Sequence, residues 1–159
     1  LRDPHRAASH PQTRELPTVE TRPRGGDEIN IIDPGRNYGW PIVTYGRNYD
    51  PSPVGDGITA KAGIEQPIYF WSPSIAPSDM VFYTGDLIPQ WKGNLCVGAL
   101  AGEHVSRLVL VGDHVVAEER LFVGFGDRIR QIRQGPDGAL YLLTDDLANG
   151  RIVRLTPRG

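Results

Sequence analysis

The chain contains the segment Gly135-Pro136-Asp137-Gly138-Ala139-Leu140-Tyr141, in which a tight turn leads directly into an apolar run. Pro-Asp-Gly is typical of a turn, and apolar residues after it are typical of a strand. Two degenerate copies of this unit lie at 11–16 and 89–95. Leu140 follows Leu95 by 45 positions, the length of one four-stranded propeller blade. Leu95 follows Leu16 by 79 positions, which is one blade plus a long loop or nearly two blades.

This spacing favours a β-propeller over a β-sandwich. Propellers close their ring with four to eight blades, and the chain holds about three units. We therefore expect residues 1–159 to form one partial β-propeller domain, roughly half of a ring whose amino-terminal blades are missing. Residues 46–66 hold six Gly and Pro residues and predict a long surface loop, a feature that suggests function or a lid.

The rest of the chain also predicts an all-β fold, because short apolar runs alternate with Gly, Pro, Asp and Asn. Nineteen glycines and 14 prolines, about a fifth of the chain, argue against a helix bundle. Gly112-Asp113 predicts a hairpin, and Pro17 should shorten its strand or push it to a sheet edge. The runs expected to form strands are 27–32, 68–71, 80–83, 95–100, 105–111, 115–116, 121–123, 128–133, 140–144 and 152–155.

Composition excludes several classes of protein. The net charge is −2, so the chain lacks the basic footprint of a nucleic-acid-binding protein. No apolar run reaches the length of about 18 residues that a membrane span needs. Cys96 is the only cysteine, which excludes an intramolecular disulfide and a multi-cysteine zinc site. Its apolar neighbours predict a buried strand residue.

Asp27 and Glu28 are adjacent carboxylates that follow Gly25-Gly26. Carboxylates beside backbone carbonyls that glycine leaves accessible suit a hard cation such as calcium. The alternative is a solvated acidic strand start. The spacing alone leaves both interpretations open.

Arg128 and Arg130 lie two positions apart on an expected strand, so their side chains should point to the same face. A matched pair of guanidinium groups suits a polycarboxylate or phosphate ligand. The alternative is an exposed face on which both arginines pair with Asp or Glu.

Several motifs together resemble one family. The segments, in chain order, are 23–30, 37–41, 45–49, 65–67, 128–130 and 135–138. In this order they resemble the carboxy-terminal portion of the soluble PQQ-dependent aldose sugar dehydrogenases of the glucose/sorbosone dehydrogenase family. The resemblance implies a six-bladed β-propeller, of which this chain covers roughly the last three blades. It also implies the cofactors PQQ and calcium, and the oxidation of an aldose sugar by hydride transfer to the quinone.

The resemblance implies cofactor contacts at four residues. Arg128 and Arg130 match an arginine pair that contacts PQQ, and Arg2 matches another PQQ-binding arginine. Asp3 stands at an asparagine contact of the family, and its carboxylate would repel those of PQQ. The catalytic base belongs upstream of residue 1, so no catalytic residue is expected here and the chain alone should be inactive.

The resemblance implies two calcium ions. The backbone carbonyls of Arg22 and Pro23 match ligands of the cofactor calcium. Glu28 and the carbonyl of Tyr38 match ligands of a second, structural calcium. Arg22 replaces a glycine of the family, which would matter if that glycine needed a positive φ.

The departures from the family, including Ala101 in place of a lysine, leave an alternative function. The chain would then be a non-catalytic β-propeller fragment or degenerate relative that acts as a binding or interaction module. In either case the unpaired edges of an incomplete propeller predict homodimers or aggregates, or pairing with the missing amino-terminal half. The family implies a periplasmic or secreted location, although the chain shows no signal peptide, and nothing indicates the electron acceptor.

Overall fold

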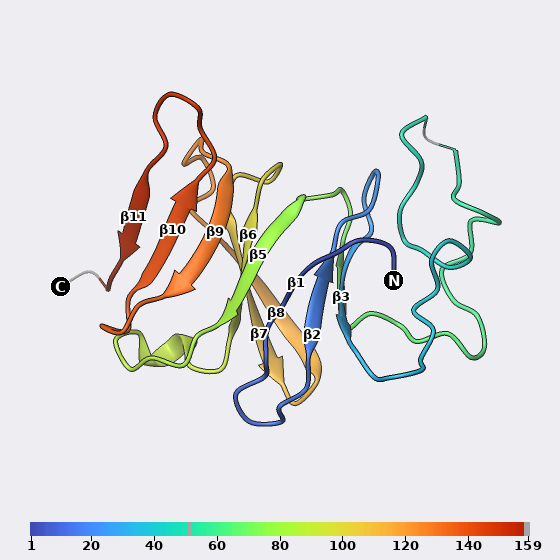
Figure 1. The fold of residues 1–159 in the computed structure, drawn as a ribbon, viewed down its shortest axis with the longest axis horizontal. Coiled ribbons are helices and arrows are strands. Elements are labelled where there is room, and N and C mark those ends of the chain that lie inside the picture. Colours follow the sequence, from blue (N-terminus) through green and yellow to red (C-terminus); the bar gives the residue numbers. More distant parts are fainter. Residues whose placement is uncertain (51, 158–159) are drawn as a thin grey trace.

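The structure is a computed structural model that describes residues 1–50 and 52–157, and its regular elements are nearly all strands (Figure 1). One short 3-10 turn, η1 (Pro89–Trp91), is the only helix in the described residues. No helix in this part of the chain is long and apolar enough to cross a membrane. The strands are β1 (Pro4–Ala7), β2 (Pro17–Glu20), β3 (Asp27–Ile31), β4 (Tyr69–Trp71), β5 (Pro77–Phe82), β6 (Leu95–Ala99), β7 (Val105–Val111), β8 (His114–Leu121), β9 (Ile129–Gln134), β10 (Leu140–Thr144) and β11 (Ile152–Leu155).

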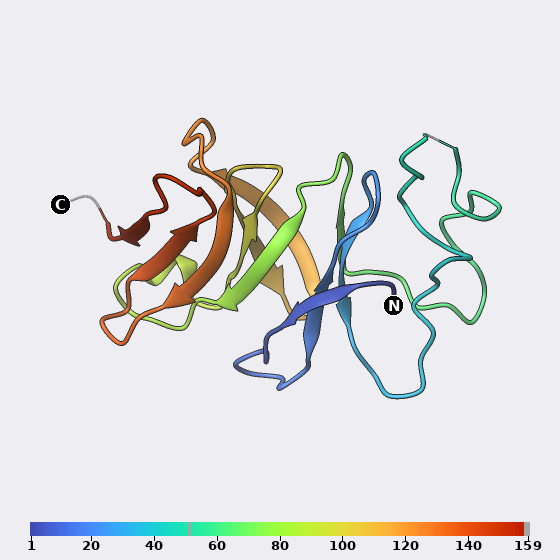
Figure 2. The same ribbon diagram turned by 45° about the horizontal axis from the view of Figure 1, so that its top comes forward.

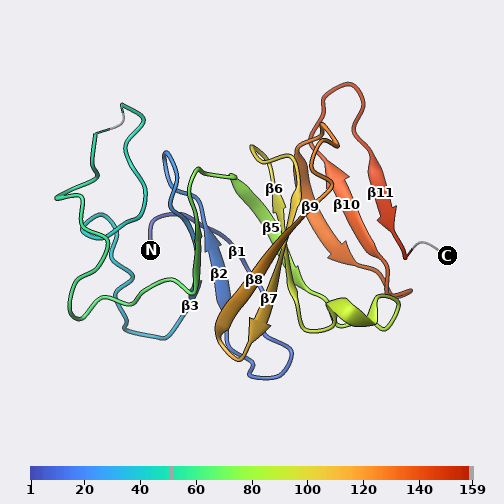
Figure 3. The same cartoon turned by 180° about the vertical axis from the view of Figure 1, so that it is seen from behind.

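The strands form three antiparallel sheets, and within each sheet the strands follow chain order. The sheets are β1-β2-β3-β4, β5-β6-β7-β8 and β9-β10-β11. They stand side by side in the order of the chain in all three ribbon views (Figures 1, 2 and 3). Successive antiparallel meanders arranged in this way are propeller blades, so the predicted all-β propeller architecture is confirmed.

The turn-then-strand units mark the same position in each blade. Leu95 begins β6 and Leu140 begins β10, each the second strand of its sheet. The unit at 11–16 leads into β2, the second strand of the first sheet. The spacing of 79 positions therefore corresponds to one blade plus the connection between β3 and β4, whose described residues form no helix or strand.

One sequence prediction is wrong, one holds in only one of its two forms, and one strand was not predicted. Pro17 does shorten its strand, but β2 is an interior strand, and Pro17 is tolerated there because it is the first residue. The run 121–123 is not a separate strand: Leu121 ends β8, and Phe122 turns the chain away with a φ of 64°. Strand β1 escaped prediction because all four of its residues are exposed, so they carry no apolar alternation.

The apolar core lies between the sheets in two clusters. One packs the first sheet on the second, through residues such as Ile29, Trp71 and Leu95. The other packs the second sheet on the third, and it contains Cys96 and Leu140. Cys96 is fully buried, as predicted, and burial raises the pKa of its thiol to about 12.

A buried carboxylate ties the sheets together. Asp79 on β5 is 1% exposed and accepts a hydrogen bond from the backbone N–H of Ile132 on β9 at 3.2 Å. It also accepts one from the guanidinium of Arg133 on β9, and it lies 3.4 Å from Nε of Arg6 on β1. The single side chain therefore connects the innermost strands of all three sheets.

Replacing Asp79 with alanine should destabilise the fold by about 2 kcal/mol, because the buried Ile132 N–H loses its acceptor. Asp86→Ala is the matched control: Asp86 also pairs with a cation, Lys92 at 2.6 Å, but its side chain is 88% exposed. The control should leave the free energy of unfolding nearly unchanged. Urea unfolding of both variants measures the difference, and equal losses would contradict the assigned role of Asp79.

Candidate functional site

A cavity of about 790 Å³ lies at one edge of the first two sheets. Its walls come from the β2–β3 turn, the β4–β5 connection, the β6–β7 turn and the β3–β4 connection. The first three of these segments rise at the top of Figure 1 and remain together in Figure 3. The lining residues that matter below are Arg22, Pro23, Arg24, Arg47, Tyr49 and Ala101. The volume is in the range of small-molecule sites.

A glycine contact brings two distant segments to this cavity. Gly26 has a φ of 73°, and a Cβ there would overlap the backbone of Gly46. Glycine is therefore required at residue 26 for the two segments to touch. As a result the N–H of Arg47 donates to the carbonyl of Arg24 at 3.3 Å.

Asp27 holds two walls of the cavity against each other. Its Oδ1 accepts a hydrogen bond from the N–H of Arg22 at 2.8 Å. Its Oδ2 accepts bonds from Oγ of Ser74 at 2.6 Å and from the N–H groups of Ile75 and Ala76 at 2.9 and 3.1 Å. Asp27 is fully buried, so a solvated acidic strand start, one of the two interpretations of Asp27 and Glu28, is wrong.

Positive charge in the cavity is uncompensated. Neither Arg24 nor Arg47 lies within ion-pair distance of a carboxylate in the described part of the chain, and Arg24 donates only to the carbonyl of Tyr49, at 3.2 Å. The walls therefore suit an anionic ligand. Sequence reasoning missed both residues, because only the contact between Gly26 and Gly46 places Arg47 beside Arg24.

The carbonyl groups of Arg22 and Pro23 fit the predicted cofactor calcium by their chemistry. Both residues line the cavity, and neither carbonyl accepts a hydrogen bond from another described residue. Arg22 is not among the residues with a positive φ, so the replacement of a glycine does not distort this backbone. Hard cations prefer such free oxygens.

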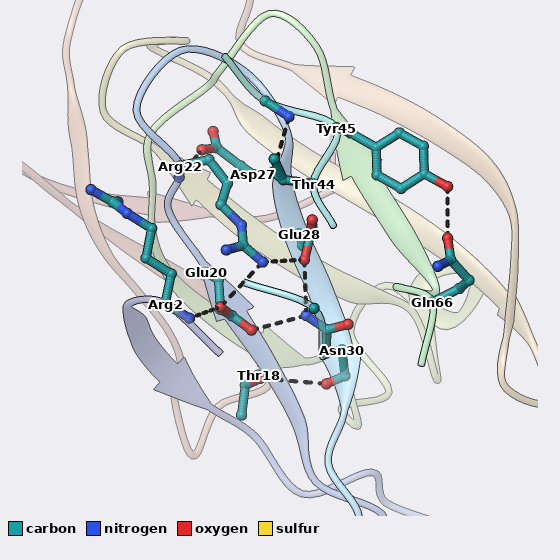
Figure 4. Close-up of polar contacts among 12 residues, drawn as sticks. Arg2, Thr18, Glu20, Arg22, Asp27, Glu28, Asn30, Thr44, Tyr45 and Gln66 are labelled. Carbon is teal, nitrogen blue, oxygen red and sulfur yellow. Dashed lines mark hydrogen bonds and ion pairs between the residues drawn. The ribbon is translucent and has the colours of Figure 1, made fainter. Parts of the chain in front are cut away.

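The side chain of Arg22 enters a buried carboxylate cluster, the Arg22 cluster, formed with Glu20, Glu28 and Asn30 (Figure 4). Its Nη2 lies 2.6 Å from Oε2 of Glu28 and 3.6 Å from Oε2 of Glu20. The Asn30 amide donates to both carboxylates, at 2.9 Å to Glu20 and 3.3 Å to Glu28. The Arg22 guanidinium also lies 5.1 Å from the ring centre of Trp40.

Burial raises the pKa of Glu28 above its ordinary value of 4.5, and the hydrogen-bonded Arg22 guanidinium opposes this only in part. Repulsion from the neighbouring carboxylate of Glu20 adds a smaller contribution that also raises the pKa of Glu28. The cluster does not fit the predicted structural calcium, because the guanidinium already occupies the coordinating side of Glu28. The other predicted ligand is the backbone carbonyl of Tyr38, whereas the hydroxyl of the same residue donates to the carbonyl of Ile31 at 2.8 Å.

Arg2 and Asp3 lie outside the cavity. The backbone N–H of Arg2 donates to Glu20 at 2.7 Å, and its guanidinium donates to the carbonyl of Thr21 at 3.0 Å. The same guanidinium lies 5.0 Å from the ring centre of Trp40. The side chain of Asp3 is 58% exposed, and its carboxylate lies 3.9 Å from His5. Arg2 thus flanks the Arg22 cluster.

Arg128 and Arg130 lie at the same edge of the third sheet. Both guanidinium groups contact one carboxylate, that of Asp145, at 3.4 and 2.6 Å. They therefore share a face, as expected from their spacing. Both side chains are half-exposed, and neither is among the described residues that line the cavity. The pairing with Asp145 corresponds to the exposed, acid-paired alternative.

Successive antiparallel blades with a basic cavity at their edge define a β-propeller protein. A model of the family described as Glucose / Sorbosone dehydrogenase matches residues 1–154. The chain therefore belongs to the glucose/sorbosone dehydrogenase family.

Three relatives show how much of the family's fold this chain covers. It is 43% identical to the aldose sugar dehydrogenase YliI of Escherichia coli (strain K12) over 99% of this chain and 43% of that protein. A crystal structure of a glucose dehydrogenase matches with a TM-score of 0.92 and 46% identity over 99% of this chain and 45% of its own. The PQQ-bound form of an aldose sugar dehydrogenase from Streptomyces coelicolor matches with a TM-score of 0.68 and 25% identity, over 94% and 42% of the two chains. The chain thus spans less than half the length of these relatives.

The raised pKa of Glu28 predicts a pH dependence. In the pH range above about 4.5 and below the raised value, the folded chain keeps a proton that the unfolded chain releases, so stability falls as pH rises. Glu28→Gln removes this titration. The stability of the natural chain relative to the variant should therefore be greatest near pH 4 and decline toward pH 7. Urea unfolding of both chains across this range measures the difference, and a constant or rising difference would contradict the assignment.

Proposed function

We propose that this chain forms the cofactor platform of a PQQ-dependent dehydrogenase that oxidises aldose sugars. The observation that carries the proposal is the cavity between the first two blades, where Arg24 and Arg47 have no carboxylate partner among residues 1–50 and 52–157. PQQ is a tricarboxylate, so it supplies the anionic groups that these arginines lack. Membership of the family and the PQQ-bound relative from Streptomyces coelicolor support the choice of this ligand.

The residues of the chain would bind and orient the cofactor. The Arg24 and Arg47 guanidinium groups would pair with its carboxylates, and the carbonyls of Arg22 and Pro23 would hold a calcium ion beside it. Arg128 and Arg130 would approach from the third sheet, aligned by their shared partner Asp145. Bound PQQ supplies the chemistry, as the acceptor of hydride from the sugar CH–OH group.

The remaining parts of the active site would be the residues at the rim of the cavity and a general base from outside this chain. Arg2, whose guanidinium donates to the carbonyl of the lining residue Thr21, would complete the rim, and Asp3 would lie next to it with its carboxylate exposed. None of the described residues that line the cavity is a histidine. His104, which follows the lining residue Ala101 in the β6–β7 turn, is buried and directs Nδ1 to the carbonyl of Gly102 at 2.7 Å, so it is not placed to take a substrate proton. We propose that the general base lies outside residues 1–159, and that the complete protein is periplasmic or secreted.

A second candidate function is a non-catalytic binding module. It is favoured by Ala101, which lines the cavity where the family resemblance implies a cofactor-contacting lysine. A small apolar side chain there removes one cation from the anion site. Under this alternative the chain would pair with another propeller segment or with a second copy of itself through its open sheet edges.

The two candidates are separated by titrating PQQ into the chain in saturating calcium and following the absorbance of the cofactor. We expect calcium-dependent binding. Arg24→Gln and Arg47→Gln should each weaken it about tenfold or more, because a charge-assisted hydrogen bond contributes about 1.5–3 kcal/mol. Arg120→Gln is the matched control, since Arg120 is an exposed arginine on β8 that already pairs with Glu118 at 3.3 Å.

The outcomes are distinct. Binding that is lost in both cavity variants and kept in the control supports the cofactor platform. Absence of binding, or equal binding by all variants, contradicts it and favours the binding module. A dye-reduction assay with PQQ, calcium and glucose should show no turnover by this chain alone, and measurable turnover would overturn the external origin of the base.

A further inference from the structure

The Arg22 cluster has the oxygen ligands of a cation site, and the guanidinium of Arg22 is the cation that these ligands contact. Glu20, Glu28 and Asn30 are 0 to 3% exposed, and the side chain of Arg22 is fully buried among them. Two carboxylates face one guanidinium, so the cluster has more negative than positive groups when both carboxylates are ionised. Buried carboxylates need a cation or a proton, because burial strongly disfavours their charge.

The guanidinium fits this site poorly. Only Nη2 of Arg22 reaches the carboxylates, whereas Nε and Nη1 are buried and have no hydrogen-bond partner in the described residues. A well-matched arginine presents two nitrogens to a carboxylate. On the other side of the cluster, Oδ1 of Asn30 is also buried and has no partner among these residues.

The oxygen atoms of the cluster suit a different cation. The two carboxylates are hard donors of the kind that bind calcium, which takes oxygen ligands at about 2.3–2.6 Å. The Asn30 amide now presents its nitrogen to both carboxylates, and turning the amide over would present Oδ1 as a third oxygen ligand. Nη2 of Arg22 lies 2.6 Å from Oε2 of Glu28, so it stands where a calcium ion on that oxygen would have to lie. The guanidinium and the ion therefore exclude each other.

We propose that Arg22 is a built-in replacement for a divalent cation: it keeps the Arg22 cluster closed to metal, and its removal uncovers a calcium site formed by Glu20, Glu28 and Asn30. The fold of this chain is then independent of calcium at this cluster. The inference concerns this chain's own residues and does not depend on PQQ binding.

The test is the variant Arg22→Ala, because Arg22 does not need a positive φ and alanine keeps the backbone. Terbium serves as the probe for calcium, since Trp40 lies 5.1 Å from the guanidinium carbon and can transfer excitation to an ion bound in its place. The experiment compares the chain, R22A and the double variant R22A/E28Q without PQQ. It measures terbium luminescence excited through tryptophan, and thermal melting in calcium and in EDTA.

We expect R22A to bind terbium at least tenfold more tightly than the natural chain and R22A/E28Q. In EDTA the R22A chain should melt below the natural chain, and 1 mM calcium should raise its melting temperature by about 5 °C while leaving the natural chain unchanged. The double variant separates this site from a calcium ion at the carbonyls of Arg22 and Pro23, because Glu28 belongs to the Arg22 cluster alone.

Other results overturn the proposal. A folded R22A chain that binds no terbium, or an R22A chain that stays unfolded in both calcium and EDTA, shows that calcium cannot replace the guanidinium. Terbium binding by the natural chain that Glu28→Gln abolishes shows that Arg22 does not exclude metal. Arg22→Lys keeps a cation in the cluster and should behave as the natural chain does, so a calcium response in this variant also counts against the proposal.

Discussion

The buried carboxylate of Asp27 is the contact on which the site geometry depends. It accepts four hydrogen bonds, one from the β2–β3 turn and three from the β4–β5 connection. The first segment joins two strands of the first sheet, the second connects the first sheet to the second, and both supply much of the cavity wall. A carboxylate has two oxygens with about four acceptor sites, so Asp27 satisfies both segments with one side chain.

Charge is distributed in three different ways around this contact. Asp27 is satisfied by N–H and O–H donors alone. Glu20 and Glu28 share the guanidinium of Arg22 in a buried cluster. Arg24 and Arg47 face the cavity, and neither pairs with a carboxylate of the described residues. The negative groups are thus hydrogen-bonded inside the protein, whereas positive charge is left at the cavity. This separation of charge favours an anionic ligand. Within the β2–β3 turn, Arg22 pairs with buried carboxylates, whereas Arg24 faces the cavity.

The blade architecture was predictable because it depends on local chemistry. The turn before Leu140 and its copy before Leu95 mark the second strand of a blade, and Gly112-Asp113 joins β7 to β8 as a hairpin. Strand β1 was not predictable, because its residues are exposed and only pairing with β2 defines it. A calcium ion at Glu28 is predicted by the adjacent carboxylates and by the family resemblance, but neither pattern indicates that Arg22 brings its side chain into the same space.

The sequence by its own patterns determines an all-β chain of repeated blades, the same-face placement of Arg128 and Arg130, and the burial of Cys96. These features follow from turn chemistry, the two-residue period of a strand and apolar neighbours. Tertiary structure alone decides that Arg47 reaches Arg24 and that Arg22 pairs with Glu28. The physical reason is that these contacts depend on how separate segments approach each other, through glycines that permit touching backbones and through buried charges that must find a partner.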